Sequence, residues 1–185
     1  GVGADELVSG YYDHYLMHLA EIRDLPEYSS TREAWEQYVR PLVRNPYLRD
    51  ADLFVNAPQF RDHIFLNSDE FAGYLTHPFC EPFVEHHYAD SLLRNRMMNE
   101  MFVEATRVIL HETDLNAMYF SIENRSPYLD RHLFEFCYSI PTRYLSRNGY
   151  NKVVLRDAAR GLAPDCVLNE RRKVGFNAPI HAFLD

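Results

Sequence analysis

Two glycines and two acidic residues stand close together in the run GVGADE, at residues 1–6. Glycine lets a backbone approach a ligand closely, and the carboxylates of Asp5 and Glu6 are hard oxygen ligands of the kind that Mg²⁺ prefers. The run is therefore a candidate for a phosphate and metal site of a nucleotide. Taken alone, it is equally typical of a glycine-rich turn whose acidic pair caps a helix.

A second polar cluster, SIENRSPYLD, occupies residues 121–130. Glu123 and Arg125 lie two positions apart in a run that ends at a proline, and near a cleft such a pair can orient a zwitterionic substrate. The alternative is an ion pair and a turn that place Tyr128 and Leu129 in the core. The pattern leaves both interpretations open.

Lys152 stands in a third run, NGYNKVVLR at residues 148–156, where Asn151 can cap a helix that ends at Gly161. An ammonium in the first turn of a helix lies where backbone amides already favour an anion, which suits pyrophosphate. Lys152 and Arg156 would then share one face. The alternative is a surface lysine at a helix start.

A fourth run, RRKVGFNAP, occupies residues 171–179 and holds three consecutive basic side chains. It can clamp a polyanion, or it can present these side chains to solvent. Composition does not choose between the two interpretations.

Helices must position these four runs, because strong strand alternation is absent from the sequence. Ser30 and Glu33 have the spacing of a capping box, which predicts a helix from there to about Arg40. Apolar residues at helical spacing from Asp90 to Ile109 predict one long, largely buried helix. We therefore expect a mainly α-helical chain.

Three further stretches complete this expectation. Residues 130–140 carry apolar side chains at three- and four-residue steps and stop before Pro141, which predicts another helix. Residues 51–90 show scattered aromatics and no clear period, so we expect short helices joined by loops. Residues 7–18 are compatible with a helix or with a loop that packs aromatic rings.

Composition narrows the class of protein and its partners. With 185 residues, of which 46% are hydrophobic, the chain can bury the core of one ordinary domain. A formal net charge of −8 argues against a nucleic-acid partner. Cys80, Cys137 and Cys166 are odd in number and far apart, which favours reduced thiols. Apolar runs of about 20 residues are absent, so we expect a soluble cytoplasmic protein without membrane partners.

The order of the four runs resembles that of the asparagine synthetase family. The chain reads GxGADELxxGY, then ExRxPYLD, then KxxLR, then RxKxGFxxP, and this succession is similar to the family's own. The resemblance covers nearly the whole chain and is strongest at residues 1–11 and 114–180.

The resemblance implies an ATP-dependent amidotransferase. Such an enzyme adenylates a carboxylate, most simply that of aspartate, releases pyrophosphate, and lets ammonia from glutamine displace AMP to give an amide. Its parent fold would be an α/β, adenine nucleotide alpha-hydrolase-like synthetase domain. Residues 1–185 would form a helical C-terminal portion of it, without the SGGxDS phosphate loop and the N-terminal glutaminase domain. We expect such a fragment to be inactive alone, and the resemblance is compatible with a homodimer.

The resemblance also implies roles for single residues, with ATP and Mg²⁺ as cofactors. Asp5 would be a Mg²⁺ ligand and part of the catalytic set. Lys152 would stabilise the charge that develops on the α-phosphate and on the leaving pyrophosphate. The run Gly1, Val2 and Gly3 would lie against the nucleotide. The polar cluster itself, and not the resemblance, makes Glu123 and Arg125 the candidates for substrate binding.

Val2 departs from the family's pattern. Asparagine synthetases commonly carry an acidic residue between the two glycines of this loop, and valine can neither accept a proton nor bind an ammonium. The departure keeps two alternatives open. One is the same chemistry on another carboxylate, such as a sugar uronate in surface-polysaccharide synthesis, and the other is a degenerate, non-catalytic binding module.

Overall fold

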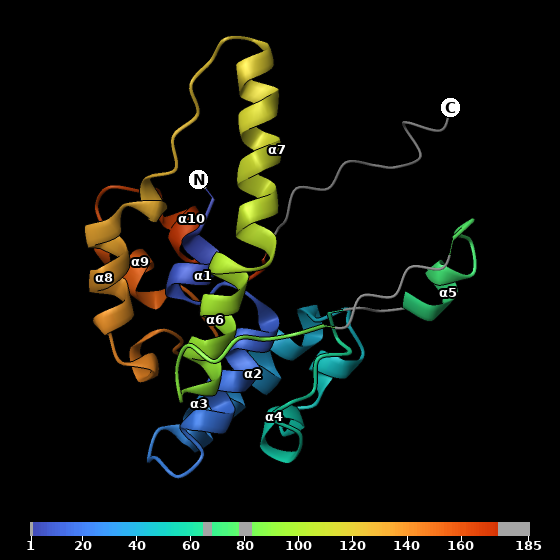
Figure 1. The fold of residues 1–185 in the computed structure, drawn as a ribbon. Coiled ribbons are helices and arrows are strands. Elements are labelled where there is room, and N and C mark those ends of the chain that lie inside the picture. Colours follow the sequence, from blue (N-terminus) through green and yellow to red (C-terminus); the bar gives the residue numbers. More distant parts are fainter. Residues whose placement is uncertain (1, 65–67, 78–82, 174–185) are drawn as a thin grey trace.

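The computed structural model describes residues 2–64, 68–77 and 83–173. Within these ranges the chain is built from helices joined by loops, and no strand is present there apart from two isolated bridges (Figure 1). The expectation of a mainly α-helical chain is therefore confirmed. The α/β fold that the resemblance implies for the parent domain is not shown by the described elements.

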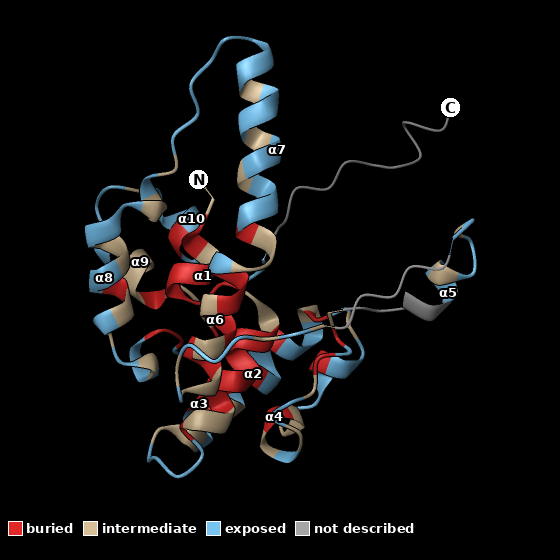
Figure 2. Cartoon of the chain, in the orientation of Figure 1, coloured by how far each residue is buried: buried red, intermediate tan, exposed pale blue. Residues whose placement is uncertain are grey.

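Three helices form the centre of the molecule: α1 (Ala4–Val8), α2 (Tyr12–Glu21) and α6 (Leu92–Phe102). Helix α6 packs against both α1 and α2, and the buried residues concentrate on these three elements (Figure 2). The run of residues 7–18, which the sequence left undecided, is thus helical on both sides of a short loop at 9–11. The largest fully buried side chains of the main core include Trp35, Tyr15, Phe54, Leu16 and Leu93.

The predicted capping box at Ser30 is wrong. Helix α3 (Tyr28–Ala34) already begins before Ser30, and the Ser30 hydroxyl donates to the carbonyl oxygen of Glu27 at 3.0 Å. A hydroxyl that bonds back to a carbonyl of the preceding turn is not available to cap an amide. The helical path then continues as a π-helical turn, η1 (Trp35–Val39), and a 3-10 turn, η2 (Arg40–Leu42), so it ends close to the predicted limit.

Short helices separate the loops of the next segment, as predicted. They are η3 (Tyr47–Arg49), α4 (Leu53–Asn56) and α5 (Ser68–Ala72). Helix α5 lies away from the body of the molecule (Figure 1).

The single long helix predicted after Asp90 is wrong, because the chain breaks it after Phe102. A second helix, α7 (Ala105–Tyr119), follows. At the break, the amides of Val103 and Glu104 both donate to the carbonyl oxygen of Asn99, and the Glu104 carboxylate accepts from Arg96 at 2.8 Å. This contact turns Glu104 back toward α6 and redirects the chain.

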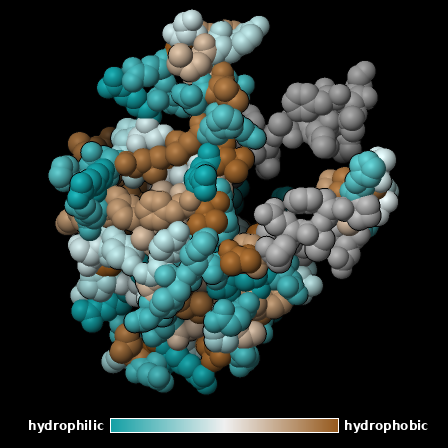
Figure 3. All heavy atoms as spheres, viewed as in Figure 1, coloured by the Kyte–Doolittle hydropathy of each residue, from teal (hydrophilic) through white to brown (hydrophobic). Residues whose placement is uncertain are grey.

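Helix α7 rises alone from the body (Figure 1) and is mostly exposed (Figure 2), with brown hydrophobic side chains visible along it (Figure 3). Val108 is 58% exposed and Ile109 is 41% exposed, so the prediction that the second half of this run is largely buried is wrong. Helical spacing shows that apolar residues share one face of a helix, but it does not show whether another element packs against that face. None of the described helices is both long and apolar enough to cross a membrane.

The last elements flank the body on one side. The 3-10 turn η4 (Pro127–Leu129) leads into α8 (Arg131–Ser139), as predicted, and the Asp130 carboxylate caps α8 by accepting from the Leu133 amide at 2.9 Å. The turn η5 (Thr142–Tyr144), α9 (Val153–Ala158) and α10 (Asp165–Leu168) follow.

A buried network of charged side chains joins α2 to α6. The His14 Nε2 and a Glu100 carboxylate oxygen lie 2.7 Å apart, and Arg96 Nε donates to Glu100 at 3.1 Å. On the other side, His63 Nε2 lies 3.2 Å from an Asp13 carboxylate oxygen. Burial alone would raise the pKa of Asp13, but the hydrogen bond from His63 and the nearby charges outweigh it and hold that pKa low. The network fixes the relative position of these two helices.

The burial of His18 in this core can be tested through the pH dependence of stability. Burial in α2 lowers the pKa of His18 to about 4, because the protonated, charged ring would not be hydrated in the core. The unfolded chain therefore binds this proton first, and stability is lost as the pH falls from about 6.5 to about 4. We predict that the free energy of unfolding falls between pH 7 and pH 4.5 in both proteins, and that the fall is about 2 kcal/mol smaller in His18→Gln than in the wild type. Urea unfolding at the two pH values measures this.

The matched control is His132→Gln on the exposed surface of α8, which keeps the wild-type pH dependence. Equal pH dependence of the His18 variant and the wild type would contradict the argument.

Candidate functional site

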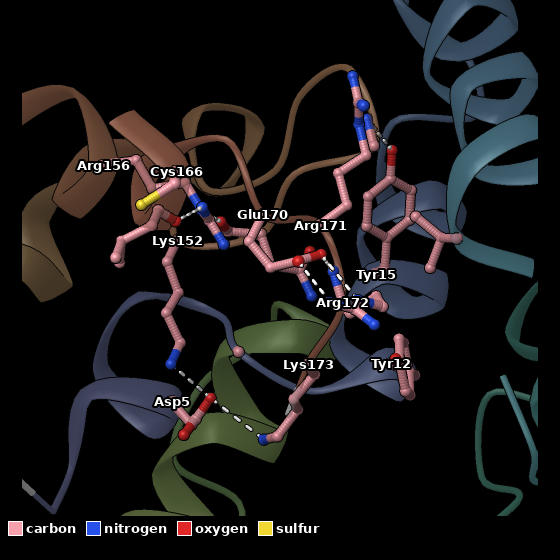
Figure 4. A pocket seen from close by; sticks show the side chains of 15 residues that line it. Asp5, Tyr12, Tyr15, Lys152, Arg156, Cys166, Glu170, Arg171, Arg172 and Lys173 are labelled. Carbon is pink, nitrogen blue, oxygen red and sulfur yellow. Dashed lines mark hydrogen bonds and ion pairs between the residues drawn. The ribbon is translucent and has the colours of Figure 1, made fainter. Parts of the chain in front are cut away.

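A cavity of about 480 Å³ lies between the loop that follows α1 and the segments around α9 and α10. Basic side chains outnumber acidic ones on its wall, which favours an anionic ligand. Figure 4 shows two of these side chains, Lys152 and Lys173, reaching toward Asp5. The basic residues are Lys152, Arg156, Arg171, Arg172 and Lys173, and the acidic ones are Asp5 and Glu170.

Asp5 holds two ammonium groups at once. Its Oδ1 atom lies 2.8 Å from the Nζ of Lys152 and 3.2 Å from the Nζ of Lys173 (Figure 4). Burial alone would raise the pKa of Asp5, but the hydrogen bond from Lys152 and the charges of both lysines outweigh it and lower that pKa. The carboxylate is therefore ionised at neutral pH and keeps both lysines at the cavity.

Gly10 makes room for this carboxylate. A Cβ atom at Gly10 would lie 1.7 Å from Oδ1 of Asp5, far inside any allowed contact. The Gly10 amide also donates to the backbone carbonyl of Asp5 at 3.0 Å. The glycine in the run ADELVSGY is thus a steric requirement of the site. No role for Gly10 was predicted, although its place in that run was the available signal.

The helix start predicted around Lys152 is wrong in detail. Lys152 precedes α9 in a left-handed conformation, with φ of 56°, and its amide donates to the carbonyl oxygen of Ser9 at 3.1 Å. Asn151 does not cap the helix, because its side chain accepts from Ser146 and donates to the Tyr11 carbonyl oxygen at 3.0 Å. These bonds join two loops that are distant in sequence, and they bring Lys152 to Asp5.

Helix α9 also ends earlier than predicted, at Ala158 instead of near Gly161. Arg156 shares the cavity wall with Lys152, but its guanidinium is engaged elsewhere. It donates to the carbonyl oxygens of Asn151 at 2.9 Å and Leu168 at 2.6 Å. Arg156 therefore holds the end of α10 in place.

The described part of the fourth run contributes three different contacts. The Arg171 guanidinium lies 4.1 Å and 4.3 Å from the ring centroids of Tyr38 and Tyr150. Arg172 pairs with Glu170 at 2.9 Å on the surface, and Lys173 reaches Asp5. The run thus directs one lysine into the cavity. Its remainder, from residue 174, lies outside the described residues.

Glu123 and Arg125 pair with each other at 3.0 Å, with 71% and 81% of their side chains exposed, and they do not line the cavity. Leu129 instead packs against the first loop, where a Cβ at Gly3 would lie 2.6 Å from its side chain. This arrangement favours the interpretation of an ion pair and a turn. The assignment of Glu123 and Arg125 to substrate binding stays a prediction.

The described part of the first glycine run does not line the cavity. Val2 and Gly3 are not among the residues that line the cavity, and Gly1 lies outside the described residues. Gly3 adopts φ of 98° immediately before α1, a conformation that suits glycine. Contact of Gly1, Val2 and Gly3 with a nucleotide stays a prediction.

Asp5 fits a magnesium ion that arrives with a nucleotide. Mg²⁺ at nucleotide sites usually takes one or two protein carboxylates together with phosphate oxygens and waters. Asp5 offers a carboxylate at the cavity, whereas the neighbouring Glu6 is buried and accepts from the Tyr11 hydroxyl. Another group with suitable ligand atoms, Asp13, His14 and Glu100, lies outside the cavity and belongs to the buried network with Arg96.

Comparisons with known proteins agree with the family resemblance. The family model described as asparagine synthase matches residues 1–185. The asparagine synthetase [glutamine-hydrolyzing] 1 of Bacillus subtilis (strain 168) is 42% identical over 76 residues. That match covers 41% of this chain and 12% of the relative, well under two thirds of its length. No solved structure matches the chain significantly.

The steric role of Gly10 can be tested by a double-mutant cycle. We predict that Gly10→Ala lowers the free energy of unfolding by about 1–3 kcal/mol, because the new methyl group collides with the Asp5 carboxylate. Asp5→Ala removes the colliding group, so the double variant should be less destabilised than the sum of the single variants. Urea unfolding of the four proteins measures the coupling, and additive effects would contradict the collision.

Proposed function

The chain belongs to the asparagine synthase family, and on that premise we propose that it forms part of an ATP-dependent ligase that converts a carboxylate into an amide. The observation that carries the proposal is the cavity in which Lys152 and Lys173 share the carboxylate of Asp5. Two ammonium groups on one carboxylate leave a net positive charge, which suits the phosphates of a nucleotide.

In this proposal Lys152 binds the phosphates and opposes the negative charge that grows when pyrophosphate leaves. A cation fixed in advance where charge develops contributes to the rate because it need not reorganise during the reaction. Asp5 keeps Lys152 oriented before the substrate binds, and it would hold Mg²⁺ when the nucleotide is present. When bound, that ion neutralises phosphate oxygens.

We propose aspartate as the first acceptor to test, with glutamine as the source of the ammonia and asparagine, AMP and pyrophosphate as products. The full-length polypeptide would supply the α/β sheet with its SGGxDS loop and the glutaminase domain, and it would act in the cytoplasm. Val2 favours a second candidate, a different carboxylate such as a sugar uronate, because the acidic side chain common at this position is missing.

Pyrophosphate release by the full-length protein tests the proposal. With ATP, Mg²⁺ and a panel of carboxylates, we predict release that Lys152→Ala lowers by at least about 100-fold in kcat, because the developing charge loses its fixed cation. The matched control is Arg160→Ala, which removes an exposed positive charge that pairs with Asp157 outside this cavity. The control should retain wild-type release.

Each outcome has a distinct meaning. Release with aspartate that depends on Lys152 would support asparagine formation despite Val2. Release with another acid alone would assign the function to that acceptor. No release with any acid would overturn the proposal in favour of a binding module. Release that Lys152→Ala leaves at the wild-type rate would overturn the role proposed for Lys152 and its cavity.

A further inference from the structure

Arg171 differs from the other basic residues of the cavity wall in its partners. The two cavity lysines bind the carboxylate of Asp5, and Arg172 pairs with Glu170. Arg171 forms no ion pair within the part of the chain that the structure describes, and its buried Nε atom has no hydrogen-bond partner there. The position of this guanidinium is therefore not explained by a carboxylate or a carbonyl group.

Two tyrosine rings hold the Arg171 guanidinium instead. It lies over the ring of Tyr38, 4.1 Å from the centroid, and over the ring of Tyr150, 4.3 Å from the centroid. Tyr38 belongs to the turn η1, whereas Tyr150 stands two positions before Lys152. A planar guanidinium can stack on aromatic faces, which the compact charge of a lysine cannot do. Arg171 thus joins η1 to the loop that carries Lys152.

The backbone of that loop also contacts η1. Gly149 has φ of 77°, and a Cβ atom there would lie only 3.0 Å from Cβ of Tyr38. The Gly149 amide donates to the hydroxyl of Tyr15, a fully buried side chain of α2, at 3.2 Å. The loop therefore packs against two elements of the body immediately before it reaches Lys152.

The turn η1 is itself unusual, because it is π-helical. Such turns are rare and are frequently found at functional sites. Here the turn presents Tyr38 to Arg171, and the next residue, Val39, lines the cavity. The helical path that contains η1 is thus connected to the cavity wall by neighbouring side chains.

We propose that Arg171, by lying over Tyr38 and Tyr150, is a positioning residue that fixes the loop before Lys152. Lys152 has a left-handed backbone, with φ of 56°, and such a conformation persists only where the surroundings hold it. The consequence for catalysis rests on the proposed function, whereas the contact and its effect on the loop do not. Loss of the contact would let the Lys152 ammonium leave its place at Asp5.

An ordinary arginine on a tyrosine does not account for this geometry. Arg143 lies 4.9 Å from the ring centroid of Tyr144, its neighbour in sequence, and both residues are exposed. That contact joins no separate elements. The contacts of Arg171 join the segment after α10, the turn η1 and the loop before α9, so one guanidinium can restrain three segments.

Hydrogen exchange of the full-length protein tests the inference in peptides that cover residues 147–153. The amide of Lys152 in this segment bonds to the carbonyl oxygen of Ser9. We predict that Arg171→Ala and Tyr38→Leu raise the exchange rate on the order of tenfold, because the loop opens more often. Tyr38→Phe keeps the ring and should keep the wild-type rate. Arg171→Lys keeps the charge without the planar group and should exchange nearly as fast as Arg171→Ala.

Two controls accompany the exchange measurement. Arg143→Ala removes a cation from an exposed ring and should leave residues 147–153 at the wild-type rate. Peptides of α6 should keep their wild-type exchange in every variant, which shows that the body is folded. If Arg171→Ala unfolds the body, Tyr38→Leu decides, since Tyr38 is 37% exposed and its loss leaves no cavity in the core.

Pyrophosphate release by the same variants tests the effect on Lys152. We predict that Arg171→Ala lowers kcat on the order of tenfold, because a small displacement of a catalytic group is enough to slow a reaction. Since Arg171 acts through Lys152, adding Arg171→Ala to Lys152→Ala should lower kcat no further. A general loss of structure would slow the double variant more than Lys152→Ala alone.

The outcomes separate this inference from the proposed function. Unchanged exchange in both Arg171→Ala and Tyr38→Leu would overturn the inference, whether or not the protein releases pyrophosphate. Faster exchange with unchanged kcat, or additive effects of Arg171→Ala and Lys152→Ala, would overturn the positioning of Lys152. In each of these cases, release that still depends on Lys152 would leave the proposed function intact. If the wild type releases no pyrophosphate with any acid, the proposed function fails, and the exchange rates alone decide whether Arg171 fixes the loop.

Discussion

The carboxylate of Asp5 is the group around which the candidate site is arranged. It sits in the space left by Gly10, and it binds the ammonium groups of Lys152 and Lys173. Each feature constrains the others, because a larger residue at position 10 would displace the carboxylate and a displaced carboxylate would release the lysines. The short helix α1 carries this side chain into the cavity, while Leu7 and Val8 of the same helix pack in the core.

Bonds between two loops make the arrangement possible. The amide of Lys152 bonds to the carbonyl of Ser9, and the side chain of Asn151 bonds to the backbone of Tyr11. A left-handed conformation costs free energy at a residue other than glycine, and the bonds around Lys152 compensate this cost. Strained backbone at a residue that faces a cavity is consistent with a role for that residue in binding.

The interior beneath the site combines apolar packing with a charged network. Arg96 and Glu100 on α6 meet Asp13 and His14 on α2, and the partners compensate the cost of burying each charge. His14 also meets the Tyr11 ring edge to face, and Lys173, which lines the cavity, lies over the face of that ring. The position of Lys173 therefore depends on packing well below the surface.

The sequence by itself determined the family and the helical character of the chain, and it singled out Asp5 and Lys152 as candidate site residues, since these depend on local spacing and on the order of motifs. Only the tertiary structure decided that α6 and α7 are separate and that Asn151 joins loops instead of capping a helix. It alone brought Lys173 to Asp5. Contacts between residues that lie far apart in the chain leave no periodic trace in the sequence, because they depend on how the helices pack.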